Sequence, residues 1–138
     1  GTVEFLSSAL VDLAFHEGAA PADPMQKQAE VLQGLGMPHA IRMRHATPHF
    51  AHVFTGDGYS AGYYSYMWSE VMDADAFAAF EEAGLDNAEA VACTGRRFRD
   101  TVLALGGSRN PAEVFTAFRS RAPSTAALLR HNGSRPLG

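Results

Sequence analysis

The chain has 138 residues, of which 46% are hydrophobic and 19% charged, a composition typical of one globular domain and not of a disordered segment. Its formal charge is −4 and it has no long basic run, which argues against a nucleic-acid-binding surface. No apolar run approaches the roughly 20 residues of a membrane-spanning helix, and a single cysteine, Cys93, excludes a disulfide within the chain.

Two helices are predicted in the N-terminal part of the chain. The first covers residues 5–15 and has its apolar residues at helical spacing: Phe5, Leu6, Ala9, Leu10 and Leu13. The second begins where Asp23 supplies an N-cap and Pro24 a first-turn residue, and it stops at Gly34 or Gly36. The prolines that follow predict an irregular stretch up to Thr47.

Helical spacing and cap signals also account for the rest of the chain, after a turn cluster at Gly56-Asp57-Gly58. They predict four more helices, over residues 60–82, 87–105, 110–118 and 123–130. Residues 133–138 are expected to fray. Because no segment has the pattern of a strand, we predict an all-α fold and a single helical domain over residues 1–138.

Three histidines, His45, His49 and His52, would share one face of a helix, and three histidines with an open position describe a catalytic zinc site. Pro48 lies inside the run and disfavours a continuous helix. No HExxH motif occurs in the 138 residues. We therefore assign no metal to this trio.

Three tyrosines follow the glycine-rich turn at positions that would share one helical stripe: Tyr59, Tyr63 and Tyr66. An aromatic stripe is usually core, but a buried phenol needs a partner for its hydroxyl, and phenylalanine is common in this chain. A row of phenols beside a glycine-rich loop could donate hydrogen bonds to a carbonyl or an oxyanion. The paired glycines Gly56 and Gly58 would let the loop move and approach a ligand closely. Spacing alone therefore favours a binding or catalytic role over core packing.

The run HVFTGDGYSAGYYSYMWSE, over residues 52–70, resembles the second signature of the thimet-oligopeptidase family of zinc metallopeptidases, which includes oligopeptidase A and the bacterial peptidyl-dipeptidases. Residues 2–5 and 8–12 are similar to the segment that precedes this signature in the peptidyl-dipeptidases. The C-terminal end of the family is matched by residues 94–100, by residues 106–108, and by Phe118 and Arg119 with Pro123. The resemblance thus covers nearly the whole chain in the correct order.

This resemblance implies a multi-helical fragment of a two-lobed, zincin-type oligopeptidase, the C-terminal part of a larger metallopeptidase catalytic domain. In the family, the zinc is held by a HExxH helix and a glutamate that lie upstream of the region seen here. We therefore expect zinc in the full-length enzyme, no metal ligand or cofactor in this chain, and no activity of the chain alone. The start at Gly1 has no initiator methionine and no signal-peptide pattern, which fits a piece of a longer protein.

The matching positions imply roles for individual side chains. The resemblance implies that His52 and Tyr66 stabilise the tetrahedral intermediate. It assigns contacts with the substrate to Tyr59 and Tyr63. Gly56 and Gly58 are predicted to bind substrate as well, because paired glycines let backbone come close to a ligand. Asp57 stands where the family usually has glycine, which predicts a less mobile loop.

The expected function is therefore that of the substrate-binding portion of a zinc-dependent oligopeptidase or peptidyl-dipeptidase, acting on short peptides in the cytoplasm. The alternative is a non-catalytic helical module that binds peptides. The expected partners are short peptides and the upstream part of the same catalytic domain, without nucleic acid or membrane. The fragment alone is expected to expose apolar surface and to self-associate.

Overall fold

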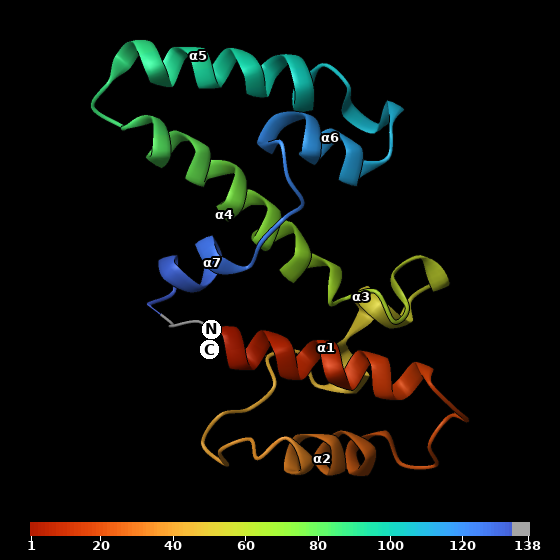
Figure 1. Cartoon of the computed structure of the whole chain (residues 1–138). Helices are drawn as coiled ribbons and strands as arrows, with labels where there is room; N and C mark the ends of the chain where they lie inside the picture. The colour runs from red at the N-terminus through yellow and green to blue at the C-terminus, as the bar shows by residue number, and fades with distance from the viewer. Residues whose placement is uncertain (134–138) are drawn as a thin grey trace. The chain divides into compact units, whose positions relative to one another are not determined.

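The computed structural model describes residues 1–133, and among these it contains seven α-helices and no strand, which confirms the all-α prediction (Figure 1). The chain divides into two compact units, Gly1–Tyr66 and Met67–Gly138, and each is described on its own. The expectation of one domain over residues 1–138 stays a prediction. The predicted fraying of residues 134–138 lies outside the described residues.

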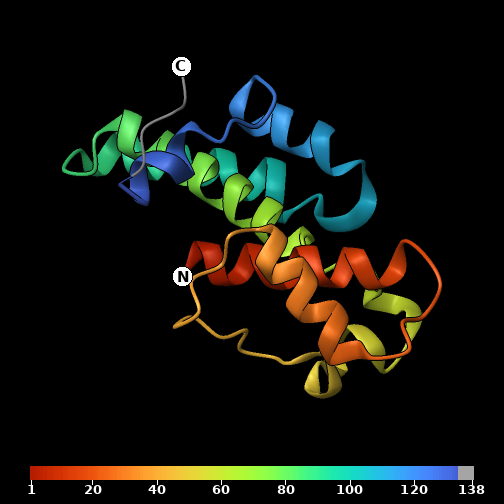
Figure 2. The same ribbon diagram turned by 90° about the horizontal axis from the view of Figure 1, so that it is seen from below.

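The first unit is built from two longer helices and several short turns of helix. Its elements are α1 (Thr2–His16), α2 (Pro24–Gly34), α3 (Ala51–Phe54) and the 3₁₀ turns Thr47–His49 and Asp57–Tyr59. Helix α2 packs against α1, and Figure 2 shows it crossing that helix. As predicted, Asp23 caps α2: its Oδ1 accepts hydrogen bonds from the backbone N–H of Met25 at 2.9 Å and of Gln26 at 3.1 Å.

The core of the first unit joins segments far apart in the sequence. Its buried apolar side chains are Val11, Met43, Phe50 and Val53. Beside it, Gln28 of α2 accepts hydrogen bonds from the backbone N–H and the hydroxyl of Thr47, at 2.8 and 2.9 Å. Because both residues are buried, these bonds satisfy groups that water cannot reach and hold the segment before α3 against α2.

Helix α1 buries only part of the apolar set that its spacing outlines, since Ala9 is buried while two leucines are not. Leu6 and Leu10 are 42% and 41% exposed, whereas Ser8 and Asp12 are 3% and 0% exposed. The buried polar side chains have partners: Ser8 bonds a carbonyl one turn earlier in α1, and Asp12 binds backbone N–H groups of a distant turn. The buried face of α1 therefore makes hydrogen bonds as well as apolar contacts.

The second unit contains most of α4 (Ser65–Ala83) and three further helices, α5 (Ala88–Phe98), α6 (Pro111–Arg119) and α7 (Ala126–His131). Helix α5 continues as a π-helical turn, Arg99–Leu103, so that the predicted helix over 87–105 is present in modified form. Asparagine side chains cap two of these helices: that of Asn87 accepts from Ala90 N at 3.1 Å, and that of Asn110 from Ala112 N at 2.9 Å.

A buried ion-pair network holds the C-terminal part of the second unit on α4. The Asp75 carboxylate, 1% exposed, accepts hydrogen bonds from Arg121 Nη1 and from the backbone N–H of Ser124, both at 2.7 Å. The nearly buried guanidinium of Arg119 lies 3.4 Å from the same carboxylate and also pairs with Glu82 at 2.7 Å. Asp75 therefore links α4 to the segment between α6 and α7.

Within residues 1–133, no helix is long and apolar enough to cross a membrane.

Candidate active site

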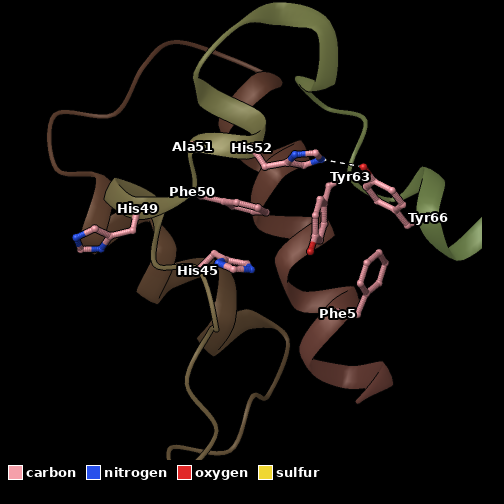
Figure 3. A pocket seen from close by; sticks show the side chains of 8 residues that line it. All are labelled: Phe5, His45, His49, Phe50, Ala51, His52, Tyr63 and Tyr66. Atoms are coloured by element: carbon pink, nitrogen blue, oxygen red, sulfur yellow. Dashed lines mark hydrogen bonds between the residues drawn. The ribbon is translucent and has the colours of Figure 1, made fainter.

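A pocket of about 610 Å³ opens in the first unit, and it brings together three of the six predicted site residues, His52, Tyr63 and Tyr66. Its walls come from α1, the segment before α3, α3, the turn after it and the start of α4 (Figure 3). The lining side chains are Phe5, His45, His49, Phe50, Ala51, His52, Tyr63 and Tyr66. The walls are thus largely aromatic, with imidazole and phenol groups as the polar functions.

The central feature of this pocket is a hydrogen bond of 2.9 Å between His52 Nε2 and the Tyr66 hydroxyl (Figure 3). His52 lies in α3, and Tyr66 is the second residue of α4. Tyr66 is 41% exposed. Both groups are therefore accessible from the pocket, and each can donate a hydrogen bond to a ligand atom once the bond between them opens.

The rings of Tyr59 and Tyr63 also lie close to the His52 imidazole. Their ring centroids are 4.4 Å and 5.9 Å from that of the imidazole. Tyr59 is 55% exposed, and its phenol is therefore free to meet a ligand. Tyr63 is partly buried, stacks on Phe5 at 5.0 Å and meets Phe50 edge to face at 4.9 Å, so that it also contributes to core packing.

The three tyrosines do not share one helix, because the long helix begins at Ser65 and not at Ser60 as predicted. Between Tyr59 and Tyr63 the chain makes a tight turn, in which the backbone N–H of Gly62 donates to the carbonyl of Tyr59 at 3.0 Å. Ala61 adopts φ +57°, in the left-handed region that costs a residue with a Cβ about 1 kcal/mol or more. This turn, and not a helical stripe, brings the phenols around His52.

Sequence reasoning missed several residues of the site. Phe5 and Phe50 form apolar walls, and the buried carboxylate of Asp12 accepts hydrogen bonds from the backbone of the tyrosine-bearing turn. Periodicity cannot reveal such contacts, since they join α1 to residues about 50 positions away. The one local signal was an aspartate in the middle of a helix, where that residue is disfavoured.

The histidines do not build a metal centre. No group of three His, Cys, Asp or Glu side chains in the part of the chain that the structure describes could hold a metal ion. His45 stacks on Phe50 at 5.4 Å, and Figure 3 shows the His49 side chain directed away from the His52–Tyr66 pair. The residues present therefore do not fit a zinc ion.

The glycine-rich turn lines a second, shallow depression beside Tyr59, together with Ala51 and His52. Apart from its chain neighbours, a Cβ atom added at Gly56 or at Gly58 would meet no atom of residues 1–133 within 4 Å, and neither residue has a left-handed φ. The contacts of the described residues therefore do not require glycine at these positions, and the close approach of a ligand to them stays a prediction.

Comparisons with known proteins show which family this chain resembles. The model of "Peptidase family M3" matches residues 2–134. Oligopeptidase A of Haemophilus influenzae is 46% identical over 110 residues, 79% of this chain and 14% of that protein. Dipeptidyl carboxypeptidase of Escherichia coli is 34% identical over 135 residues, 94% of this chain and 19% of that protein. A probable cytosolic oligopeptidase A of Arabidopsis thaliana is 63% identical over 84 residues, 61% of this chain and 12% of that protein. The chain spans less than a fifth of the length of each of these relatives.

Proposed function

Because this chain belongs to peptidase family M3, we propose that it forms the C-terminal, substrate-binding part of a metallopeptidase that hydrolyses short peptides. The names of its relatives, oligopeptidase A and dipeptidyl carboxypeptidase, support this substrate class. The observation that carries the proposal is the His52–Tyr66 pair, joined at 2.9 Å in an aromatic pocket, with the Tyr59 ring against the imidazole.

The chemistry assigned to this pair is stabilisation of charge on the scissile carbonyl. When a nucleophile adds to that carbonyl, its oxygen becomes an oxyanion, and donors aimed at that position lower the barrier. In the protein without substrate, the His52 imidazole and the Tyr66 hydroxyl are hydrogen-bonded to each other. On substrate binding, both groups turn toward the carbonyl oxygen. Replacing the His52–Tyr66 hydrogen bond by hydrogen bonds to the substrate costs little free energy, because both groups are exposed to solvent before the substrate arrives.

The metal of the proposed enzyme is held by residues outside this chain. No HExxH motif occurs among its 138 residues, and the described residues offer no metal site. The contribution of residues 1–133 is to bind the peptide, orient its carbonyl and supply hydrogen-bond donors.

An exposed apolar row on α1 supports a larger catalytic domain around this chain. Val3, Leu6 and Leu10 lie one or two turns apart on that helix and are 60%, 42% and 41% exposed. In the full-length enzyme the upstream part of the domain covers this row, and in the isolated chain the row promotes self-association. A cytoplasmic location of the full-length enzyme belongs to the proposal and rests on the name of one plant relative, since a second plant relative of equal identity is named organellar.

The isolated 138-residue chain is expected to hydrolyse no peptide, with or without added zinc, because its sequence has no HExxH motif and residues 1–133 offer oxyanion donors but no metal site. Incubation of the purified chain with a fluorogenic peptide, in zinc and in chelator, measures this. Cleavage that depends on metal and stops with chelator would contradict the assignment of the metal to residues outside the chain. The same assay on the full-length protein separates the peptidase from a module that binds peptides without cleaving them.

Tyr59→Phe in the full-length enzyme is expected to lower kcat/KM about tenfold, with changes in both kcat and KM. The phenol is 55% exposed and follows the glycine-rich turn, so that it can close over the peptide and bind ground state and transition state alike. Steady-state kinetics on one short peptide measure the two constants. Unchanged constants would remove Tyr59 from the substrate contacts.

A further inference from the structure

The carboxylate of Asp12 is the most deeply buried charged group of the first unit, at 0% exposed. Its two oxygens have separate partners in the turn before α4. Oδ1 accepts a hydrogen bond from the backbone N–H of Ala61, and Oδ2 accepts one from the backbone N–H of Tyr63, both at 3.0 Å. Asp12 therefore binds the turn from α1, about 50 residues away in the sequence.

The turn depends on this carboxylate because its own backbone cannot supply the same contacts. Ala61 is held at φ +57°, which alanine rarely adopts unless surrounding contacts stabilise it. The partly buried backbone N–H groups of Ala61 and Tyr63, on either side of Gly62, both donate to the Asp12 carboxylate. Without the carboxylate they would lose these hydrogen bonds, and Ala61 would be free to leave its left-handed conformation.

His16 lies beside the carboxylate. Its Nδ1 is 2.7 Å from the backbone carbonyl oxygen of Asp12 and 3.0 Å from Asp12 Oδ1, one helical turn along α1, and its ring stacks on Phe54 at 5.4 Å. The two backbone N–H groups of the turn are therefore the donors dedicated to the carboxylate, while the imidazole nitrogen also lies against the carbonyl oxygen of α1.

We infer that Asp12 is a positioning residue for the proposed active site: by fixing the backbone of Ala61 and Tyr63, it sets the places of the Tyr59 and Tyr66 phenols relative to His52. This inference rests on the proposed function. Tyr59 comes two residues before Ala61, and Tyr66 three residues after Tyr63, in the first turn of α4. A shift of about 1 Å in a donor is enough to lower a catalytic rate by about a hundredfold.

The test is Asp12→Asn in the full-length enzyme. Whichever way the amide is turned, one acceptor oxygen becomes an N–H₂ donor that faces a backbone N–H. The matched control is Asp23→Asn, since Asp23 also accepts two backbone N–H groups but does so through one oxygen, which asparagine keeps. We expect Asp12→Asn to lower kcat about 10- to 100-fold with a smaller change in KM, and Asp23→Asn to leave both constants unchanged.

Hydrogen exchange of the same proteins, followed by mass spectrometry of peptic peptides, gives a readout that does not depend on activity. We expect faster exchange in the peptides that cover residues 59–66 of Asp12→Asn, and wild-type exchange in those from α5 and α6. Wild-type kcat in Asp12→Asn would overturn the inference, and so would faster exchange spread evenly over the chain, which would make Asp12 a residue of general stability. An inactive wild-type enzyme would contradict the proposed function instead, while the exchange data would still report on the turn.

Discussion

Tyr66→Phe in the full-length enzyme is expected to lower kcat about 10²- to 10³-fold and to leave KM nearly unchanged. Tyr66 is anchored in the first turn of α4, and its hydroxyl is already aligned with His52 Nε2 at 2.9 Å. A donor held in this way contributes mainly when charge develops on the substrate oxygen, so that its loss appears in kcat. The substitution removes one exposed hydroxyl, and the free energy of unfolding should hardly change.

The control for this substitution is Tyr64→Phe. Tyr64 is 46% exposed, close to the exposure of Tyr66, but it does not line the pocket. Steady-state kinetics of both variants on one peptide, with metal content measured for each, should show a large loss only for Tyr66→Phe. Equal kcat values in the two variants would mean that the Tyr66 phenol takes no part in the chemistry.

Asp75→Asn is expected to lower the free energy of unfolding of the second unit by about 1–3 kcal/mol, because it removes the buried charge that accepts hydrogen bonds from Arg121 and from the backbone N–H of Ser124. Neither arginine is left buried without a counter-charge, since Arg119 still pairs with Glu82 and Arg121 is 43% exposed. Urea denaturation followed by circular dichroism measures the change. Asp73→Asn, an exposed aspartate of the same helix, is the control and should unfold like wild type.

The difference between wild type and Asp75→Asn should depend on pH in a defined direction. Burial by itself raises the pKa of the Asp75 carboxyl, but the hydrogen bonds from Arg121 and Ser124 and the charges of the arginines outweigh it, so that the pKa is lowered. A carboxyl with a lowered pKa in the folded state stabilises fully above its unfolded pKa of about 3.9 and loses this contribution as the pH falls further. The two proteins should therefore differ by a constant amount near neutral pH and converge below about pH 4. A difference that grows on acidification would show that the ion pair does not stabilise this unit.

The helices were largely predictable from local chemistry. The caps at Asp23, Asn87 and Asn110 and the glycine turn at Gly84 mark helix ends through hydrogen bonds within a few residues, and such signals can be read from a sequence. The start of α4 could not be predicted in this way. Residues 60–64 have good helical spacing, but a left-handed Ala61 held from α1 makes them a turn.

The sequence indicated the region of the candidate site but not the arrangement of its side chains. Of the residues that spacing and resemblance singled out, His52, Tyr63 and Tyr66 line one pocket, while Tyr59 lies against the imidazole and lines a neighbouring depression. Helical periodicity, however, suggested one row of equivalent phenols. The structure gives them different surroundings, because Tyr63 packs between Phe5 and Phe50 while Tyr66 bonds the imidazole. Packing between distant segments determines this difference.

The most direct test of the proposed role of this chain is a crystal structure of the full-length enzyme with a peptide analogue that carries a tetrahedral phosphinate in place of the scissile amide. The proposal predicts that the His52–Tyr66 hydrogen bond opens and that His52 Nε2 and the Tyr66 hydroxyl each lie about 2.7–3.1 Å from one phosphinate oxygen. A bound analogue that leaves the bond between His52 and Tyr66 closed, with neither group on the phosphinate, would contradict it.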